Sequence, residues 1–121
     1  LHPRTQKLIY QAGLKLNATV LPPVGYFDML YLLKNCSLVM TDSGGLQKEA
    51  FFFAKNCVTM REQTEWVELI NGGFNVLSGA NTNKIILLCN EMLNKVNNFN
   101  VDLYGNGKAG QNITQHILKN I

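Results

Sequence analysis

Residues 37–50 read SLVMTDSGGLQKEA, and this stretch decides the fold. Ser37–Thr41 is a short apolar run of the kind that forms a buried strand. Asp42–Gly45 interrupts the run with residues that favour turns. A helix is expected from about Leu46 to Ala54. The stretch therefore predicts a strand, a sharp turn and a helix in succession, as in an α/β protein.

The same alternation of strands and helices continues on both sides of this stretch. Further strands are expected at Ala18–Leu21, Cys57–Met60 and Phe74–Leu77. Further helices are expected at Pro3–Leu16, Tyr26–Asn35, Trp66–Ile70, Asn83–Val96 and Ala109–Ile121. Strands that are apolar throughout are typical of a sheet covered on both faces, and right-handed crossovers make that sheet parallel. The predicted class is α/β, a parallel sheet flanked by helices.

Ligands of parallel sheets bind beyond the carboxyl ends of the strands. That rule points to the loops Pro22–Gly25, Asp42–Gly45 and Arg61–Glu65. In the second loop, a serine and two glycines stand where a helix begins, where unpaired N–H groups favour an anion and missing side chains allow a phosphate to approach. Glu49 follows about one and a half helical turns later and could accept hydrogen bonds from a ribose diol.

Phosphate and diol contacts on one helix describe a nucleotide site. The same residues also fit a serine N-cap before a glycine turn, with Lys48 and Glu49 in solvent, and the spacing alone does not choose between the two interpretations. The stretch is neither a P-loop nor the glycine fingerprint of dinucleotide-binding folds.

Composition narrows the function classes. The 121 residues suit one domain, with 46% hydrophobic and 16% charged residues. The net charge is +3, and the basic residues form no stripe along the sequence, which disfavours nucleic-acid binding. No apolar run approaches membrane-spanning length. Cys36, Cys57 and Cys89 lack metal-ligand spacing, so reduced cysteines, a cytoplasmic location and no metal or other cofactor are expected.

Five blocks together carry a resemblance to a known family. Thr41–Gly45, with Gln47 and Glu49-Ala50 after it, closely resembles the signature of the non-hydrolysing UDP-N-acetylglucosamine 2-epimerases. Four more blocks resemble that family in order and spacing, namely His2-Pro3-Arg4, Pro23–Tyr26 with Met29, Arg61 with Thr64-Glu65 and Glu68, and Tyr104-Gly105-Asn106-Gly107 with Ala109. The likeness covers nearly the whole chain.

The resemblance implies a Rossmann-like domain, the C-terminal half of a two-domain GT-B fold. Residues 1–121 are expected to be a part of that domain in a longer epimerase, without its first strand and helix and without the N-terminal domain. UDP would be held by Ser43, Gly44 and Gly45 at the diphosphate, by Glu49 at the ribose, and by the segment from Pro23 to Met29 near the uracil. His2, Arg4, Arg61 and Glu65 are weaker candidates that would line the cleft.

The reaction implied is the interconversion of UDP-N-acetylglucosamine and UDP-N-acetylmannosamine by elimination and re-addition of UDP. The family places the carboxylates that support it mainly in the N-terminal domain, so no catalytic residue is assigned here and this chain alone is expected to be inactive. A homodimer of the full-length protein and a bacterial pathway of polysaccharide biosynthesis are further expectations.

Departures from the family pattern leave alternatives open. Met29 stands for a usual Phe, Lys48 for a Glu, Asn106 for an Asp, and Trp66-Val67 for Arg-Pro. A half of a GT-B glycosyltransferase would share the ribose-binding acid, and a stand-alone nucleotide-sugar-binding module would fit the length. The sequence does not choose between UDP-N-acetylglucosamine and its diacetamido uronic acid relatives. One of Phe51–Phe53 is expected to face solvent or a missing partner, because three consecutive aromatics cannot share one helix face.

Overall fold

The computed structural model describes residues 1–120, which form two compact units, residues 1–35 and residues 36–120. The first unit holds α1 (Pro3–Gln11) and α2 (Tyr26–Asn35). The second holds every strand of the described chain, in the order β1 (Val39–Thr41), α3 (Gly44–Phe52), β2 (Cys57–Thr59), α4 (Val67–Asn71), β3 (Asn75–Leu77), α5 (Thr82–Asn94), η1 (Gly105–Gly107) and α6 (Ala109–Lys119).

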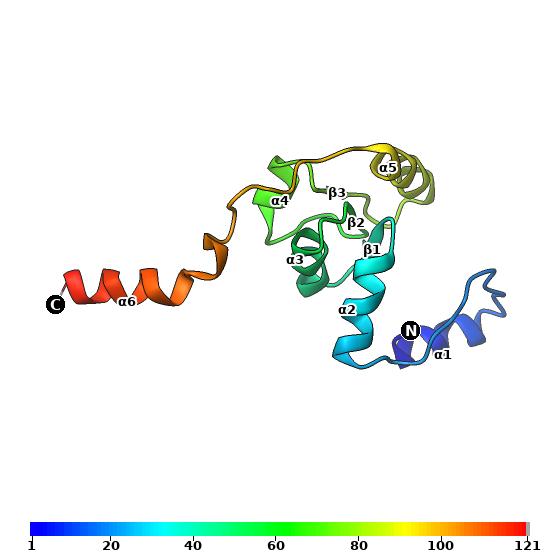
Figure 1. Cartoon of the computed structure of the whole chain (residues 1–121). Helices are drawn as coiled ribbons and strands as arrows, with labels where there is room; N and C mark the ends of the chain where they lie inside the picture. Colours follow the sequence, from blue (N-terminus) through cyan, green and yellow to red (C-terminus); the bar gives the residue numbers. More distant parts are fainter. Residues whose placement is uncertain (121) are drawn as a thin grey trace. The chain divides into compact units, whose positions relative to one another are not determined.

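The three strands form one parallel sheet in the order β1-β2-β3 (Figure 1). Met40 pairs with Val58, and Val58 pairs with Val76, so the strand ends are level and the loops after them meet at one edge. The central strand β2 is buried throughout, whereas Met40 on the edge strand β1 stays 46% exposed. The predicted parallel α/β sheet is confirmed for this unit.

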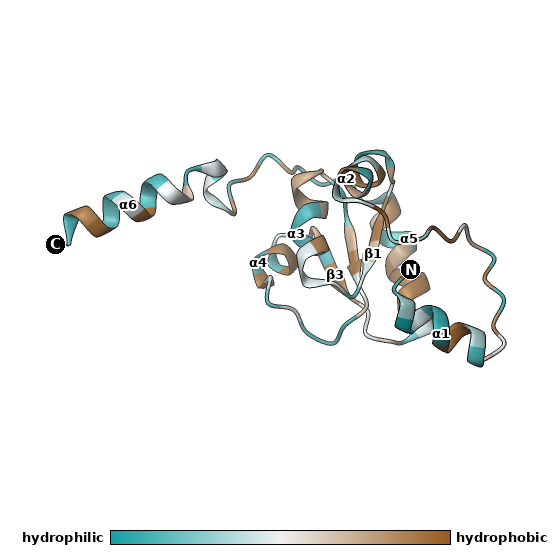
Figure 2. Ribbon diagram, turned by 90° about the horizontal axis from the view of Figure 1, so that it is seen from below, coloured by the Kyte–Doolittle hydropathy of each residue, from teal (hydrophilic) through white to brown (hydrophobic). Residues whose placement is uncertain are grey.

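Helices cover both faces of the sheet. In both ribbon views α3 lies on one side of the strands and α5 on the other (Figures 1 and 2). On the α3 side, Phe51, Leu69 and Phe74 form a buried cluster. Phe99, Leu103 and Tyr104 pack against that cluster, so the segment after α5 folds back over α3 and α4.

Two predictions for the first unit are wrong. Helix α1 ends at Gln11 rather than near Leu16, because Gly13 adopts a φ of +62° and closes the helix with hydrogen bonds from Gly13 N–H to Tyr10 and from Leu14 N–H to Ile9. Ala18–Leu21 is not a strand, since within the described residues it has no strand partner, and the prolines that follow offer no N–H donors.

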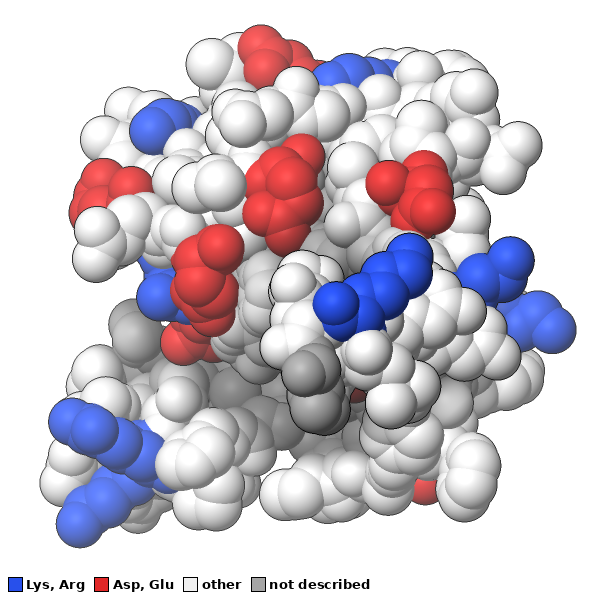
Figure 3. Space-filling model, turned by 90° about the vertical axis from the view of Figure 1, so that its left-hand side faces the viewer, with Lys and Arg blue, Asp and Glu red and all other residues white. Residues whose placement is uncertain are grey.

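The C-terminal helix α6 is amphipathic, with hydrophobic and hydrophilic residues alternating along it (Figure 2). The expected end of this helix at Ile121 lies outside the described residues. Lys and Arg side chains on the face in Figure 3 do not form a continuous stripe, and Asp and Glu lie among them. Between residues 1 and 120, the structure contains no helix that is long and apolar enough to cross a membrane.

Candidate functional site

The predicted anion site lies at the junction of β1 and α3. Ser43 has an extended backbone, with φ −79° and ψ 133°, and is the N-cap residue of α3. Its hydroxyl makes no capping hydrogen bond, so the serine-cap interpretation is not realised in this structure. Instead, the Ser43 N–H donates to Thr41 Oγ1 at 3.0 Å, which fixes the turn from the strand side.

The two glycines that begin α3 have different surroundings. A Cβ at Gly44 would overlap the carboxylate of Glu65, which lies over this residue. A Cβ at Gly45 would meet no atom within 4 Å in the described chain. The open approach to the start of α3 is therefore over Gly45, not over both glycines as the motif predicted.

Glu49 shares the open face of the helix with Gly45. The two residues are four apart in the sequence, which places them one above the other on an α-helix. Glu49 is half-buried, and its carboxylate has no hydrogen bond or ion pair to any described residue. An anion-accepting backbone and an uncommitted carboxylate thus stand on one side of α3.

The loop after β2 approaches the start of α3 from the neighbouring strand. Arg61 Nη1 lies 3.1 Å from Glu65 Oε2, and this partly exposed ion pair holds the Glu65 carboxylate near Gly44. Trp66 Nε1 donates to the Gly44 carbonyl at 2.8 Å. The structure therefore brings together two of the three predicted loops, Asp42–Gly45 and Arg61–Glu65.

The remaining predicted residues belong to the first unit. His2, Pro23 and Met29 line a hollow of about 400 Å³, together with Leu1, Pro3 and Val24. His2 also begins α1, where its Nδ1 accepts the Arg4 N–H at 3.2 Å. Arg4 is exposed and does not line the hollow.

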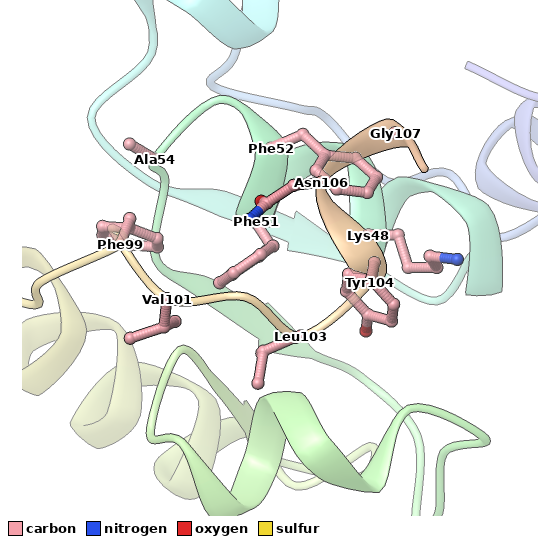
Figure 4. Close-up of a pocket in the computed structure, with 10 residues that line it drawn as sticks. All are labelled: Lys48, Phe51, Phe52, Ala54, Phe99, Val101, Leu103, Tyr104, Asn106 and Gly107. Carbon is pink, nitrogen blue, oxygen red and sulfur yellow. The ribbon is translucent and has the colours of Figure 1, made fainter. Parts of the chain in front are cut away.

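A second cavity, of about 500 Å³, lies between α3 and the returning segment (Figure 4). Most of its lining is aromatic or aliphatic, including Phe51, Phe52, Phe99 and Tyr104. Lys48 stands at its side with Nζ 4.4 Å from the Trp66 ring centre and 4.3 Å from that of Tyr104. None of the predicted UDP ligands lines this cavity.

A group of buried polar residues behind the turn was missed by the sequence analysis. Gln47, Asn75 and Thr59 are each no more than 1% exposed and are hydrogen-bonded to one another. Gln47 stands inside the recognised motif, and Asn75 is a polar residue in an otherwise apolar strand. Those two positions are the signals that could have revealed the group.

The described residues contain no cluster of metal ligands. Across residues 1–120, no group of three His, Cys, Asp or Glu side chains is placed to hold a metal ion. Cys57 and Cys89 are free thiols. Burial raises the pKa of the Cys57 thiol to about 11, against the weaker lowering effect of its hydrogen bond with Thr59.

The parallel sheet, its crossover helices and the glycine turn at its carboxyl edge define a Rossmann-like α/β protein. A family model described as UDP-N-acetylglucosamine 2-epimerase matches residues 1–118. The chain belongs to the UDP-N-acetylglucosamine 2-epimerase family, and its expected place within the GT-B fold is confirmed by solved relatives.

Two curated relatives illustrate the match. The UDP-2,3-diacetamido-2,3-dideoxy-D-glucuronate 2-epimerase of Pseudomonas aeruginosa is 51% identical over 119 residues, covering 98% of this chain and 34% of that protein. The UDP-N-acetylglucosamine 2-epimerase of Methanocaldococcus jannaschii is 40% identical over 121 residues, covering 95% of this chain and 33% of that protein. The chain thus spans about a third of the length of these relatives.

A solved structure gives the corresponding three-dimensional match. The Methanocaldococcus jannaschii UDP-GlcNAc 2-epimerase, in complex with UDP-GlcNAc and UDP, superimposes with a TM-score of 0.80 at 39% identity. The match covers 98% of this chain and 34% of that one.

Proposed function

We propose that this chain is the UDP-binding portion of a UDP-N-acetylglucosamine 2-epimerase, a partial C-terminal Rossmann-like domain of the whole enzyme. The observation that carries the proposal is the shared face of Gly45 and Glu49 on α3, at the carboxyl edge of a parallel sheet. A helix N-terminus attracts the diphosphate, and a free carboxylate on the same face accepts the ribose hydroxyls.

The other residues have supporting roles in this proposal. Ser43 offers its uncommitted hydroxyl to the diphosphate, the Gly44 backbone faces it, and Gly45 keeps the approach free of side chains. Pro23 and Met29 contact the uracil, and the apolar hollow that they line suits a flat, weakly polar ring. His2, Arg4, Arg61 and Glu65 line the rest of the cleft.

The reaction of the whole enzyme is elimination of UDP and its re-addition after inversion at C2, without net hydrolysis. Its charge-stabilising carboxylates lie outside these residues in the proposal, so this chain binds UDP but does not turn over UDP-sugars. The whole enzyme acts in the cytoplasm as a homodimer. These statements rest on family membership.

A second candidate substrate is a UDP-2,3-diacetamido uronic acid. It is favoured by the 51% identity to the Pseudomonas aeruginosa enzyme that carries this substrate in its name. Both substrates share the UDP end, so both candidates require the same contacts from this chain. The family match favours an epimerase over the glycosyltransferase alternative.

Calorimetric titration of the chain with UDP tests the proposal. Glu49→Ala removes the ribose acceptor and should weaken UDP binding by at least tenfold, since a hydrogen bond to a charged group contributes about 1.5–3 kcal/mol. Ser43→Trp should abolish binding by filling the approach. Glu91→Ala, an exposed acid on α5, is the matched control and should bind as the unaltered chain does. Unchanged affinity in both site variants would contradict the proposal, and epimerisation by the chain alone would contradict its inactivity.

A further inference from the structure

A continuous chain of hydrogen bonds runs from the middle of the sheet to the turn before α3. Thr59 Oγ1 donates to Asn75 Oδ1 at 2.9 Å, and Asn75 Nδ2 donates to Gln47 Oε1 at 2.9 Å. These three side chains come from β2, β3 and α3 and are fully buried. Buried polar groups are stable only when they are paired, so such a chain allows few alternative arrangements.

At Gln47 this series of hydrogen bonds branches to two loops. Gln47 Nε2 donates to the Ser43 carbonyl at 3.2 Å, and Gln47 Oε1 also accepts a hydrogen bond from Thr64 Oγ1 at 2.7 Å. Thr64 Oγ1 in turn accepts the N–H of Trp66 at 3.2 Å. Because Gln47 Oε1 already receives two donors, the amide nitrogen must face Ser43, and the orientation of the side chain is fixed.

The two loops held by Gln47 are the ones that surround the start of α3. Gln47 Nε2 donates to the Ser43 carbonyl and Trp66 Nε1 donates to the Gly44 carbonyl, so both carbonyls are hydrogen-bonded within the protein. The first-turn N–H groups of a helix have no intrahelical partners and stay available to a ligand.

We propose that Gln47 is a positioning residue for the diphosphate of the UDP-sugar, supported by Asn75 and Thr59 and acting on the second loop through Thr64. It fixes the Ser43–Gly45 turn and the Arg61–Trp66 loop in one arrangement before the ligand arrives. Preorganisation of this kind raises affinity because no loop has to be ordered on binding. This inference rests on the proposed function.

Two variants test the inference by calorimetry with UDP. Gln47→Met keeps the volume and removes all the hydrogen bonds of the side chain, so the Kd for UDP should rise at least tenfold. Gln63→Met, at an exposed glutamine of the same loop, is the matched control and should leave the Kd unchanged. Thr64→Val removes the half-exposed hydroxyl that donates to Gln47 and should raise the Kd for UDP severalfold. Thr64→Ser keeps that hydroxyl and should leave the Kd at the value of the unaltered chain.

Fluorescence of Trp66, the only tryptophan, separates positioning from general destabilisation. At temperatures where circular dichroism shows a folded chain, Thr64→Val should make Trp66 more accessible to acrylamide, and Thr64→Ser should not. A UDP Kd within twofold of the unaltered value in folded Gln47→Met, or in Thr64→Val if Gln47→Met does not fold, would overturn the positioning role alone. Failure of the unaltered chain to bind UDP would instead overturn the proposed function and this inference with it.

Discussion

The carboxylate of Glu65 covers Gly44 so closely that no side chain could be added there without moving it, whereas the neighbouring Gly45 is open. The two glycines of the motif therefore serve different purposes. Gly44 makes room for a protein side chain that comes from the loop after β2. Gly45 leaves the start of α3 accessible on the face that also carries Glu49.

Substituting alanine at each glycine in turn should distinguish the two roles. Gly45→Ala should stabilise the fold by up to about 1 kcal/mol, because alanine is the better helix former, yet it should weaken UDP binding by tenfold or more. Gly44→Ala should show little net gain in stability, since its methyl group displaces Glu65 from an ion pair that contributes about 0–1 kcal/mol. Thermal unfolding and calorimetric titration measure both effects. Full UDP affinity in Gly45→Ala would place the diphosphate elsewhere.

The ion pair beside the site predicts opposite effects for its two members. Arg61→Gln should weaken UDP binding about fivefold, and Glu65→Gln should strengthen it about fivefold, because one charge at about 4 Å contributes on the order of 1 kcal/mol in water. Both effects should shrink in about 1 M salt, where screening is strong. Glu91→Gln on α5 is the charge-matched control. Weaker binding by Glu65→Gln would mean that this carboxylate accepts a hydrogen bond from the ligand.

Local sequence patterns were sufficient to predict most of the helices and strands of the second unit. The apolar run ending at Thr41 and the glycine turn predicted β1 and α3 to within about two residues of their observed bounds, because both signals act over a few residues. Phe51 is buried and Phe52 is 61% exposed, which confirms that the aromatic run cannot share one face. The first unit was less predictable, since the closing hydrogen bonds at Gly13 ended α1 before its apolar pattern did.

The candidate site was predictable only where one helix carries it. The spacing of Gly45 and Glu49 follows from the helical period alone, and their roles toward UDP stay predictions. The buried bonds of Gln47 depend on Thr59, Thr64 and Asn75, which the strand register and the loop after β2 bring to one place. No local pattern encodes that register, so the support behind the turn became visible only in three dimensions.

Stability outside the site depends on Asn56, which is 8% exposed. Its Nδ2 donates to the carbonyls of Met92 and Lys95 at 2.8 Å each, at the end of α5. Asn56→Asp keeps the shape but loses both donors, and it should lower the free energy of unfolding by roughly 2–4 kcal/mol. Asn94→Asp, at an exposed position with a hydrogen bond within α5, should cost less than about 1 kcal/mol. Denaturant titrations measure both free energies of unfolding, and similar values for the two variants would contradict this prediction.

The buried thiol of Cys57 predicts how stability changes in alkali. Its pKa is raised from 9.0 to about 11 by burial, so the folded chain keeps a proton that the unfolded chain releases from about pH 9. The contribution of this thiol to the free energy of unfolding is complete below pH 9 and is lost as the pH rises through 11. Between these values the free energy of unfolding should fall by up to about 1.4 kcal/mol per pH unit.

Urea titrations between pH 8 and 10 measure this slope against Cys57→Ala. That variant should be less stable at pH 8, because it leaves a small cavity, and the difference from the unaltered chain should narrow as pH rises. Staying at or below pH 10 limits the contribution of Tyr104, whose pKa burial also raises from its ordinary value of 10. Stability curves that stay parallel over this range would show that the thiol ionises alike in the folded and unfolded chains.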